Sequence, residues 1–414
     1  MTQSNTSLED EVPQDDIILV INCGSSTVKY KLLEIATNQI LLKGVFEGIE
    51  QQHVQHSYEW LDNKKQLHQV NNALSNASYA TCFNVIAEII RSIKCQSPTA
   101  VGHRVVHGGE EFIKPTLINA TVIAKIEQLS VLAPLHNPIN LQGICLCIDL
   151  FPNVPHIAVF DTAFHQSMPD YAYRYPIAEY WYADHDIRKY GFHGTSHQYV
   201  AQQAANYLQK PLTTLNLITL HLGNGDSATA IQQGQCIDTS MGFTPLAGLM
   251  MGTRCGDIDP AIPLYMQKCT NMDREQVRNE LNHQSGLLAV TGSQDMREIL
   301  QRSNQGDPAS ELALNMYCYR IKKYIGAYLA LLGPVDAIVF TAGVGENSAE
   351  IRSRCCQQLE SFGINIDAAL NEQAIDDIST INTNTSPIKL LVIKTNEERQ
   401  IANEVSEFIK EFNH

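Results

Sequence analysis

The chain contains three glycine-rich turns, and each follows a run of apolar β-forming residues. Residues 17–21 lead into NCGSSTVK at 22–29, and residues 217–221 lead into LGNGDS at 222–227. The third turn, TAGVGENS, lies within residues 340–348. Glycine lets the backbone approach an anion closely, while hydroxyls, amides and lysine donate to its oxygens. Three such turns in one chain predict a phosphate-bearing ligand, and a nucleotide best of all.

The pattern of these turns excludes two common nucleotide folds. None matches GxxxxGK[ST] or a full GxGxxG, so neither a P-loop enzyme nor a dinucleotide-binding dehydrogenase is favoured. Taken singly, each turn is equally well an ordinary tight hairpin, because Gly, Asn and Ser are the usual turn residues. Their recurrence at comparable strand ends favours phosphate binding. The third turn is expected to open a helix, whose N-terminus favours negative charge.

Length and charge narrow the class of protein further. A chain of 414 residues predicts about two domains, with a catalytic cleft between them. The net charge of -15 and the absence of basic runs exclude nucleic acid and anionic membrane as the main partner. Eleven scattered cysteines without CxxC pairs are typical of reduced thiols. We therefore expect a cytoplasmic protein with a frayed polar tail at residues 1–16 and no membrane span.

Hydrophobic periodicity predicts an α/β protein whose second half repeats the layout of the first. Asn119 or Thr121 is expected to cap one helix, and Thr395 or Asn396 the terminal one. Strands are expected at 17–21, 28–33, 39–46, 99–106, 157–160, 217–221, 228–232, 337–339 and 390–394. Helices are expected at 119–132, 138–150, 307–332, 346–362, about 81–92, and the C-terminus.

Two arginines stand isolated in almost uncharged, glycine-rich surroundings. Arg104 lies in VGHRVVHGG and Arg254 in MMGTRCG. A guanidinium group keeps its proton and matches a carboxylate or phosphate with two donors, so two arginines can hold two anions together. The alternative is a structural salt bridge to a core aspartate. Asp257 and Asp259 are equally well placed to orient Arg254.

Histidines gather in the middle of the chain. Nine of the fourteen fall within residues 103–221, in segments expected to be strand ends and loops. His193 and His197 have the i, i+4 spacing of a zinc pair, but no glutamate completes an HExxH site. A helix start capped by Thr195 or Ser196 explains the same segment.

Two aspartates carry functional and structural alternatives. Asp161 ends an apolar strand, where a carboxylate can act as a base, bind a metal or orient water; a turn-forming aspartate is the other interpretation. Asp295, followed by Met296 and Arg297, is placed to contact a ribose or base. A helix-start aspartate is at least as well supported there.

Nine segments in order resemble the acetate kinase family, from about residue 17 to near the C-terminus. They are NCGSSTVKY, GHRVVHGGE, APLHNP, FDTAFHQSMP, YGFHGTSH, HLGNGDS, DTSMGFTPLAGLMMGTRCGDIDP, AGVGEN and TNEE. The resemblance implies an α/β fold of two ribonuclease H-like, actin-like ATPase domains, duplicated around an interdomain nucleotide cleft. Residues 17–161 plus 398–414 would form the first domain. Residues 162–397 would form the second and carry most nucleotide contacts, and the protein would be a homodimer.

The reaction implied by this resemblance is reversible phosphoryl transfer from ATP to a short-chain carboxylate, giving ADP and an acyl phosphate. Magnesium, or manganese in its place, would accompany the nucleotide. Arg104 and Arg254 would hold the carboxylate and the transferring group. His193 would donate to the phosphoryl oxygens with His136 nearby, and Asp161 would orient or polarise the reacting groups.

The resemblance also assigns binding residues. For the nucleotide they are Ser25, Thr27, Lys29, His221, Leu222, Gly223, Asn224, Gly225, Asp295, Met296, Arg297, Gly343, Val344, Gly345, Glu346 and Asn347. For magnesium, bound directly or through water, they are Asn22 and Glu397. For the methyl end of acetate they are Val106, Leu135, Phe192 and Pro245.

Valine at 106 predicts a small pocket, so propionate should react more weakly than acetate. Propionate kinase of the same fold is the nearest competing assignment. A switch-type ATPase of the same superfamily is the alternative from another class. The isolated arginines favour a carboxylate site over such a switch.

Three residues depart from the family pattern: Thr27, Asp226 and Ala247. Thr27 keeps a hydroxyl. Asp226 adds negative charge beside the second turn and is expected to weaken ATP binding, unless it points away or meets magnesium.

Overall fold

The computed structural model describes residues 16–62, 64–93 and 97–412, and the chain divides into two compact units. The first unit comprises Met1–Val105, Pro115–Val159 and Ile401–His414; the second comprises Val106–Lys114 and Phe160–Gln400. The tail predicted at residues 1–16 lies outside the described residues except for its last position. The domain limits expected from sequence stay a prediction. Across the described ranges, no helix is long and apolar enough to cross a membrane.

An eight-stranded sheet forms the first unit, in the order β5-β4-β3-β2-β1-β6-β8-β7. Its strands are β1 (Ile17–Cys23), β2 (Thr27–Glu34), β3 (Gln39–Glu47), β4 (His53–Leu61), β5 (Leu67–Ser75), β6 (Ala100–Val105), β7 (Thr116–Leu117) and β8 (His156–Phe160). Its helices are α1 (Tyr79–Ser92), α2 (Ala120–Gln128), the 3-10 turn η1 (Leu129–Val131), α3 (Asn137–Leu150) and the greater part of α15 (Glu397–Phe412).

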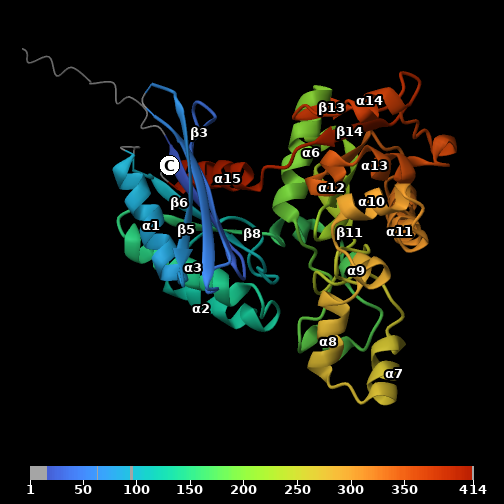
Figure 1. The fold of residues 1–414 in the computed structure, drawn as a ribbon, viewed down its shortest axis with the longest axis horizontal. Helices are drawn as coiled ribbons and strands as arrows, with labels where there is room; N and C mark the ends of the chain where they lie inside the picture. Colours follow the sequence, from blue (N-terminus) through green and yellow to red (C-terminus); the bar gives the residue numbers. More distant parts are fainter. Residues whose placement is uncertain (1–15, 63, 94–96, 413–414) are drawn as a thin grey trace, which may run out of the picture. The chain divides into compact units, whose positions relative to one another are not determined.

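Strand β1 is buried on both faces because its side chains alternate between two hydrophobic clusters. Ile17, Leu19 and Ile21 pack in the cluster that contains α1 residues, whereas Ile18 and Val20 pack with residues of α15. The sequence of a central strand that is covered on both faces is a continuous apolar run. This burial fixes the end of β1, where the first glycine-rich turn begins. Figure 1 shows α1 and α15, which supply these covering residues, beside the sheet of this unit.

A six-stranded sheet forms the second unit, in the order β11-β10-β9-β12-β14-β13. Its strands are β9 (Asn216–Leu222), β10 (Asp226–Gln232), β11 (Gln235–Thr239), β12 (Ala337–Thr341), β13 (Ile378–Thr380) and β14 (Lys389–Ile393). Its α-helices are α4 (Asp170–Tyr173), α5 (Glu179–Ala183), α6 (Gly194–Leu208), α7 (Ala261–Thr270), α8 (Arg274–His283), α9 (Gly286–Thr291), α10 (Met296–Asn304), α11 (Pro308–Leu332), α12 (Ala342–Asn347), α13 (Ala349–Cys356) and α14 (Ala368–Glu372). Its 3-10 turns are η2 (Ala163–Ser167), η3 (Leu212–Thr214) and η4 (Glu360–Phe362).

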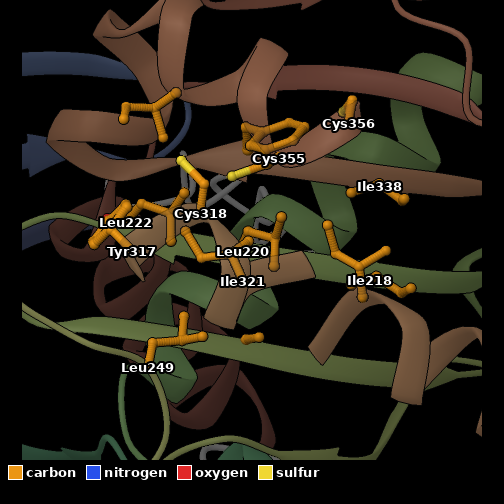
Figure 2. Packing of buried hydrophobic residues seen from close by; sticks show 14 of the residues in the cluster. Ile218, Leu220, Leu222, Leu249, Tyr317, Cys318, Ile321, Ile338, Cys355 and Cys356 are labelled. Atoms are coloured by element: carbon orange, nitrogen blue, oxygen red, sulfur yellow. The ribbon is translucent and has the colours of Figure 1, made fainter. Parts of the chain in front are cut away.

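The long helix α11 covers one face of this second sheet. Figure 2 shows Tyr317, Cys318 and Ile321 of α11 among Leu220 and Leu222 of β9. Helix α6 packs on the other face, where its buried residues share a cluster with Leu217 and Val339. The ends of β9 and β12 are therefore held between two helical layers.

The two sheets repeat one strand order. In each, three antiparallel strands form a meander and the first of them pairs in parallel with a later strand: β1 with β6, and β9 with β12. The first and second glycine-rich turns are the equivalent β1–β2 and β9–β10 connections. This duplicated α/β arrangement is the predicted actin-like ATPase fold class.

Most predicted elements are present, and two predictions were wrong. Residues 346–362 do not form one helix, because Ser348 leaves the helical region with φ -115° and ψ 95° and caps α13 instead. The cap predicted for α2 is confirmed at Asn119, the first of its two candidates, which accepts from the Val122 N–H. Neither Thr195 nor Ser196 caps α6, since both lie inside its first turn. At the C-terminal helix, Asn396 accepts from the Arg399 N–H as a cap would.

Candidate functional site

The second and third turns of the chain lie next to each other in the second unit. Thr341, the last residue of β12, pairs with His221 of β9, so the two strands end at the same edge. A Cβ at Gly223 would lie 3.7 Å from the Ala342 Cβ and 3.9 Å from the Gly343 nitrogen. Backbone amides of two separate turns are thereby presented from one place.

His193 stands at the start of α6 in a left-handed conformation, with φ 57° and ψ 23°. This conformation is uncommon for a residue with a side chain, although histidine adopts it more readily than most. The His193 ring stacks on His221, with centroids 4.2 Å apart. Sterically restricted backbone of this kind concentrates at functional sites.

The next residue, Gly194, allows the backbone at the start of α6 to pass close to Asp161. Its N–H donates to the Asp161 carbonyl at 2.9 Å, and a Cβ at this position would lie 2.2 Å from the same oxygen. Only glycine fits this close approach. Asp161, itself 1% exposed, accepts from the Thr195 hydroxyl at 3.3 Å through Oδ1. The predicted carboxylate thus lies buried against the first turn of α6.

Ser227 joins the two histidines that sequence spacing had paired. Its hydroxyl lies 2.9 Å from His193 Nδ1 and 2.7 Å from His197 Nε2, and His197 Nδ1 lies 2.7 Å from the Thr219 hydroxyl. Burial lowers the pKa of His197 well below its ordinary value, so this ring is neutral. The pair therefore shares a hydroxyl and forms a hydrogen-bonded chain that orients His193.

Arg254 lies beside His193 and the second glycine-rich turn. A Cβ at Gly225 would lie 3.4 Å from both Arg254 Nη1 and His193 Nε2. Arg254 Nη1 donates to the Pro245 carbonyl at 3.3 Å, and burial lowers the pKa of this guanidinium while Asp226 opposes the shift. The glycine at 225 leaves room where the arginine and the imidazole converge.

The two aspartates considered as partners of Arg254 have other roles. Asp257 accepts from the Gly248 N–H at 2.8 Å and from the Tyr324 hydroxyl at 2.6 Å. Asp259 accepts from the Ala261 N–H at 2.8 Å. The expectation that these residues orient Arg254 was wrong, because their carboxylates hold loop and helix backbone.

A small apolar cluster lies beside Arg254. It consists of Val106, Phe192, Met241 and Met251, all nearly or fully buried. Met251 also approaches Arg254, with Sδ 3.9 Å from Nη1. Val106 and Phe192 are thus brought together next to a cation, as their predicted role requires. Leu135, predicted to join them, belongs to the first unit and is 47% exposed.

Asp226 points away from the loop surface. Its side chain is fully buried, and Oδ1 accepts from the Gly223 N–H at 2.6 Å. Burial raises the pKa of this carboxyl to about 8, although the Gly223 amide, Tyr317 and Arg254 favour the charged form. The sequence left the direction of this residue open, and the structure turns it inward.

The third turn is tied to the segment before Glu397. Glu346 Oε1 accepts from the Ala342 N–H at 2.8 Å and from the Thr395 N–H at 2.9 Å. The Thr395 hydroxyl also lies 2.8 Å from the Ser196 hydroxyl. Glu346 therefore has a structural task, while Gly343 and Asn347 of the same turn are exposed.

A buried arginine supports the third turn through hydrogen bonds to its backbone carbonyls. Buried Arg352 donates to the carbonyls of Gly345 and Glu346, each at 2.9 Å, and to Asn371 Oδ1 at 2.7 Å. Burial lowers its pKa to about 10. Val344 packs against the main cluster of the unit.

Asp295 begins helix α10, as the structural alternative predicted. Its side chain accepts from the Arg297 N–H and pairs with the exposed Arg297 guanidinium at 2.7 Å, which lowers the pKa of Asp295 to about 2. Met296 is buried in the main cluster. Gln294 and Asn224 both approach Gly252, so this segment lies close to the second turn.

In the first unit, Arg104 reaches the end of β1. Its Nη1 donates to Asn22 Oδ1 at 3.1 Å, across the parallel pairing of β6 with β1. The first turn is pinned by the Tyr79 hydroxyl, which donates to the Gly24 carbonyl at 2.6 Å. Ser25, Thr27 and Lys29 line this turn, with Ser25 and Lys29 exposed. His136 precedes α3 in the same unit and is half-buried.

Two residues, Asn22 and Glu397, are assigned to magnesium. Asn22 and Glu397 both offer oxygen, which magnesium prefers. Within residues 16–62, 64–93 and 97–412, no group of three or more His, Cys, Asp or Glu can hold a metal. Single oxygen donors of this kind suit an ion that keeps waters and is carried mainly by phosphates, not one held in a protein cage.

Several contributors were missed from the sequence. Ser227 and Thr219 orient the histidine pair, and Met241 and Met251 complete the apolar cluster. Their partners lie on other strands or loops, so no spacing pattern relates them. For Met251 the sequence offered one signal, because this residue lies three positions before Arg254.

Comparisons with known proteins agree over most of the chain. The model of the acetokinase family matches residues 17–403. An acetate kinase from Clostridium novyi is 47% identical over 408 residues, covering 96% of this chain and 99% of that protein. The crystal structure of a propionate kinase from Francisella tularensis matches with a TM-score of 0.89 and 43% identity, covering 94% and 98% of the two chains. An acetate kinase structure from Porphyromonas gingivalis matches with a TM-score of 0.88 and 39% identity, covering 95% and 100%.

Proposed function

The chain belongs to the acetokinase family, and we propose that it transfers the γ-phosphoryl group of ATP reversibly to acetate. A carboxylate oxygen attacks the γ-phosphorus and forms a new P–O bond. The bond to the β–γ bridging oxygen breaks, and ADP leaves with its electron pair. The products are ADP and acetyl phosphate. The observation that carries this proposal is the meeting of Arg254, His193 and the two glycine-rich turns beside a small apolar cluster.

A carboxylate is already a competent nucleophile, so the protein needs no strong base. The obstacle is the approach of one anion to another in line. Arg254 supplies positive charge at the second turn, and its guanidinium stays protonated. Arg104 of the first unit is proposed to hold the carboxylate, with its orientation supported by Asn22.

His193 is proposed to donate from Nε2 to a phosphoryl oxygen. Its Nδ1 lies beside the Ser227 hydroxyl, and donation by that hydroxyl leaves the ring proton on Nε2. The Nε2 edge lies next to Gly225 and Arg254. Asp161 is proposed to orient the reacting groups, and its burial against Thr195 holds it in one position. His136 is proposed to assist from the first unit.

The nucleotide is proposed to bind the three turns, with its adenosine near Asp295–Arg297 and residues 343–347. Magnesium, or manganese in its place, would neutralise charge on the phosphates when bound. Asn22 and Glu397 would hold it, directly or through water. We propose that the chain has two domains, at residues 17–161 plus 398–414 and at 162–397, and that the second carries most nucleotide contacts.

Acetate is the proposed preferred acceptor. The cluster around Val106 and Phe192 gives its methyl group an apolar surface beside a cation. One methylene changes the discrimination by about 1–3 kcal/mol, so propionate should still react, but less well. The similarity to a propionate kinase structure favours that activity as the second candidate.

We propose a cytoplasmic homodimer. Free thiols at the ten described cysteines support a reducing compartment. Helix α7 supports self-association, because none of its ten residues, all described, is buried and it exposes Leu264 and Tyr265. Light scattering of the purified chain tests the dimer, and Leu264→Glu with Tyr265→Glu should give a monomer.

Hydroxylamine trapping of acyl phosphate tests the activity. The protein is incubated with ATP, magnesium and either formate, acetate, propionate or butyrate. Acetate should give the highest rate of hydroxamate formation, with propionate next. Release of ADP without dependence on any carboxylate would instead identify a switch-type ATPase.

A further inference from the structure

Asp226 closes the base of the second turn. It pairs with Leu222 across the β9–β10 hairpin, so residues 223–225 form the loop between them. Its Oδ1 accepts from the Gly223 N–H at 2.6 Å. One side chain thus joins the two ends of a loop only three residues long.

The other oxygen of Asp226 faces the interior. Oδ2 and the Tyr317 hydroxyl are both buried, and neither has a hydrogen-bond partner of ordinary geometry in the described part of the chain. The two groups interact with each other, and Tyr317 belongs to the same hydrophobic cluster as Leu222 (Figure 2). Two buried polar atoms so placed indicate a functional pair, since leaving either unmatched costs free energy.

We propose that Asp226 is a positioning residue of the second turn, holding Gly223 so that the amides of Asn224 and Gly225 are the donors offered to the nucleotide phosphates. This inference rests on the proposed function. It follows from which donors are engaged: the Gly223 amide is used by Asp226. No hydrogen bond among the described residues engages the Asn224 or Gly225 amide, and Asn224 is exposed.

Ionisation of the Asp226 carboxyl should weaken the binding of phosphates. Its carboxyl, with a pKa of about 8, is largely protonated at neutral pH. In that state Oδ1 still accepts from Gly223, as an asparagine would, and no negative charge is added. Ionisation at higher pH places a negative charge near Arg254, with Tyr317 on α11 as the other titratable group facing it. Phosphate binding should then weaken.

The experiment compares Asp226→Asn with Asp226→Ala in the full-length protein. Binding of magnesium-ADP by calorimetry and the KM values for magnesium-ATP and acetate are measured from pH 6.5 to 9. Asp226→Ala should raise the Kd for ADP and the KM for ATP about tenfold at pH 7, while the KM for acetate stays within about twofold. Asp226→Asn should stay within about threefold of the parent at pH 7. Its ADP affinity should lose the decline that the parent shows above pH 8.

Two further variants separate positioning from general damage. Tyr317→Phe should shift the pH at which ADP affinity declines, whereas Tyr328→Phe should not. Tyr328 is the matched control, because it lies on the same helix, is equally buried and has its hydroxyl 3.4 Å from the Ala228 carbonyl. Parental ADP affinity in Asp226→Ala would overturn the proposal. If that variant fails to fold, an Asp226→Asn protein with the parent's pH profile would overturn it. A parent that binds ADP but forms no acyl phosphate would refute the proposed function alone.

Discussion

The Nδ1 atom of His193 lies 2.9 Å from the hydroxyl oxygen of Ser227, and that oxygen also serves His197. The imidazole that faces Arg254 is therefore oriented by a residue of the neighbouring strand. His193 and His197, which have the i, i+4 spacing of a zinc pair, share this hydroxyl.

Ser227→Ala should lower kcat about tenfold with little change in either KM, because the proposed donor loses its orientation. His193→Ala should lower kcat at least a hundredfold, as expected for removal of a group that acts on the transition state. Steady-state kinetics measure both effects. Ser406→Ala is the control, since it removes a buried hydroxyl bonded to Asp16 in the other unit. Parental kcat in Ser227→Ala would refute the orienting role.

Arg254→Ala and Arg104→Ala should each lower turnover at least a hundredfold while the protein stays folded. Loss of an arginine that stabilises a phosphoryl-transfer transition state costs on the order of 10³ in rate. Arg254→Lys should recover only part of the activity, because an ammonium group lacks the planar fork. Circular dichroism establishes the fold and hydroxamate formation the rate. Retained activity in either alanine variant would remove that arginine from the mechanism.

Gly194→Ala should destabilise the second unit and abolish activity, because the added methyl group would lie 2.2 Å from the Asp161 carbonyl oxygen. We expect a loss of roughly 2–4 kcal/mol in the free energy of unfolding, as for other severe overpacking. Urea titration measures it. Gly326→Ala is the matched control: it lies in α11, nothing approaches its Cβ position within 4 Å, and its stability should stay level or rise by up to about 1 kcal/mol. Equal stability of the two variants would contradict this account.

The stability of the parent should fall as pH rises from about 4 to about 8, through Asp226. Its folded-state pKa of about 8 exceeds the ordinary value, so in that range the folded protein binds a proton that the unfolded chain has released. Asp226→Asn lacks this linkage. The variant's advantage in unfolding free energy over the parent should therefore grow between pH 5 and pH 8, by on the order of a few kcal/mol. Urea titrations at both pH values measure it, and an advantage independent of pH would show that the carboxyl titrates normally.

Val106→Ala should shift specificity toward propionate. Val106 belongs to the cluster with Phe192, Met241 and Met251, so shortening it opens space beside Arg254. The ratio of kcat/KM for propionate over acetate should rise about tenfold, the effect of one methylene in an apolar pocket. Kinetics with the two carboxylates measure this ratio. An unchanged ratio would place the end of the acceptor elsewhere.

The sequence predicted the elements that have a local cause. The apolar run at 17–21 became a strand buried on both faces, and Asn119 became a helix cap. The long helix predicted at 346–362 failed, because helical periodicity continues across Ser348 while its side chain instead caps a new helix. The hydrophobic pattern alone does not show whether the helix continues or whether Ser348 ends it by capping α13.

In the site, too, residues with a local sequence signal were predicted, whereas contacts made by residues distant in the sequence were not. Glycine-rich turns and isolated arginines marked Gly225 and Arg254 without any structural knowledge. The inward direction of Asp226 was not predictable, since it depends on a tyrosine ninety-one positions away on α11. Likewise, the carboxylates nearest to Arg254 in sequence hold other backbone. Proximity along the chain did not decide which charges meet.

The strand order shared by both sheets is the mark that tandem copying of one ancestral half would leave. The two equivalent hairpin tips nevertheless carry different chemistry. The β9–β10 tip adjoins the imidazoles that share Ser227, whereas the β1–β2 tip follows an asparagine joined to Arg104. One strand plan thus presents two unlike sets of side chains within a single polypeptide.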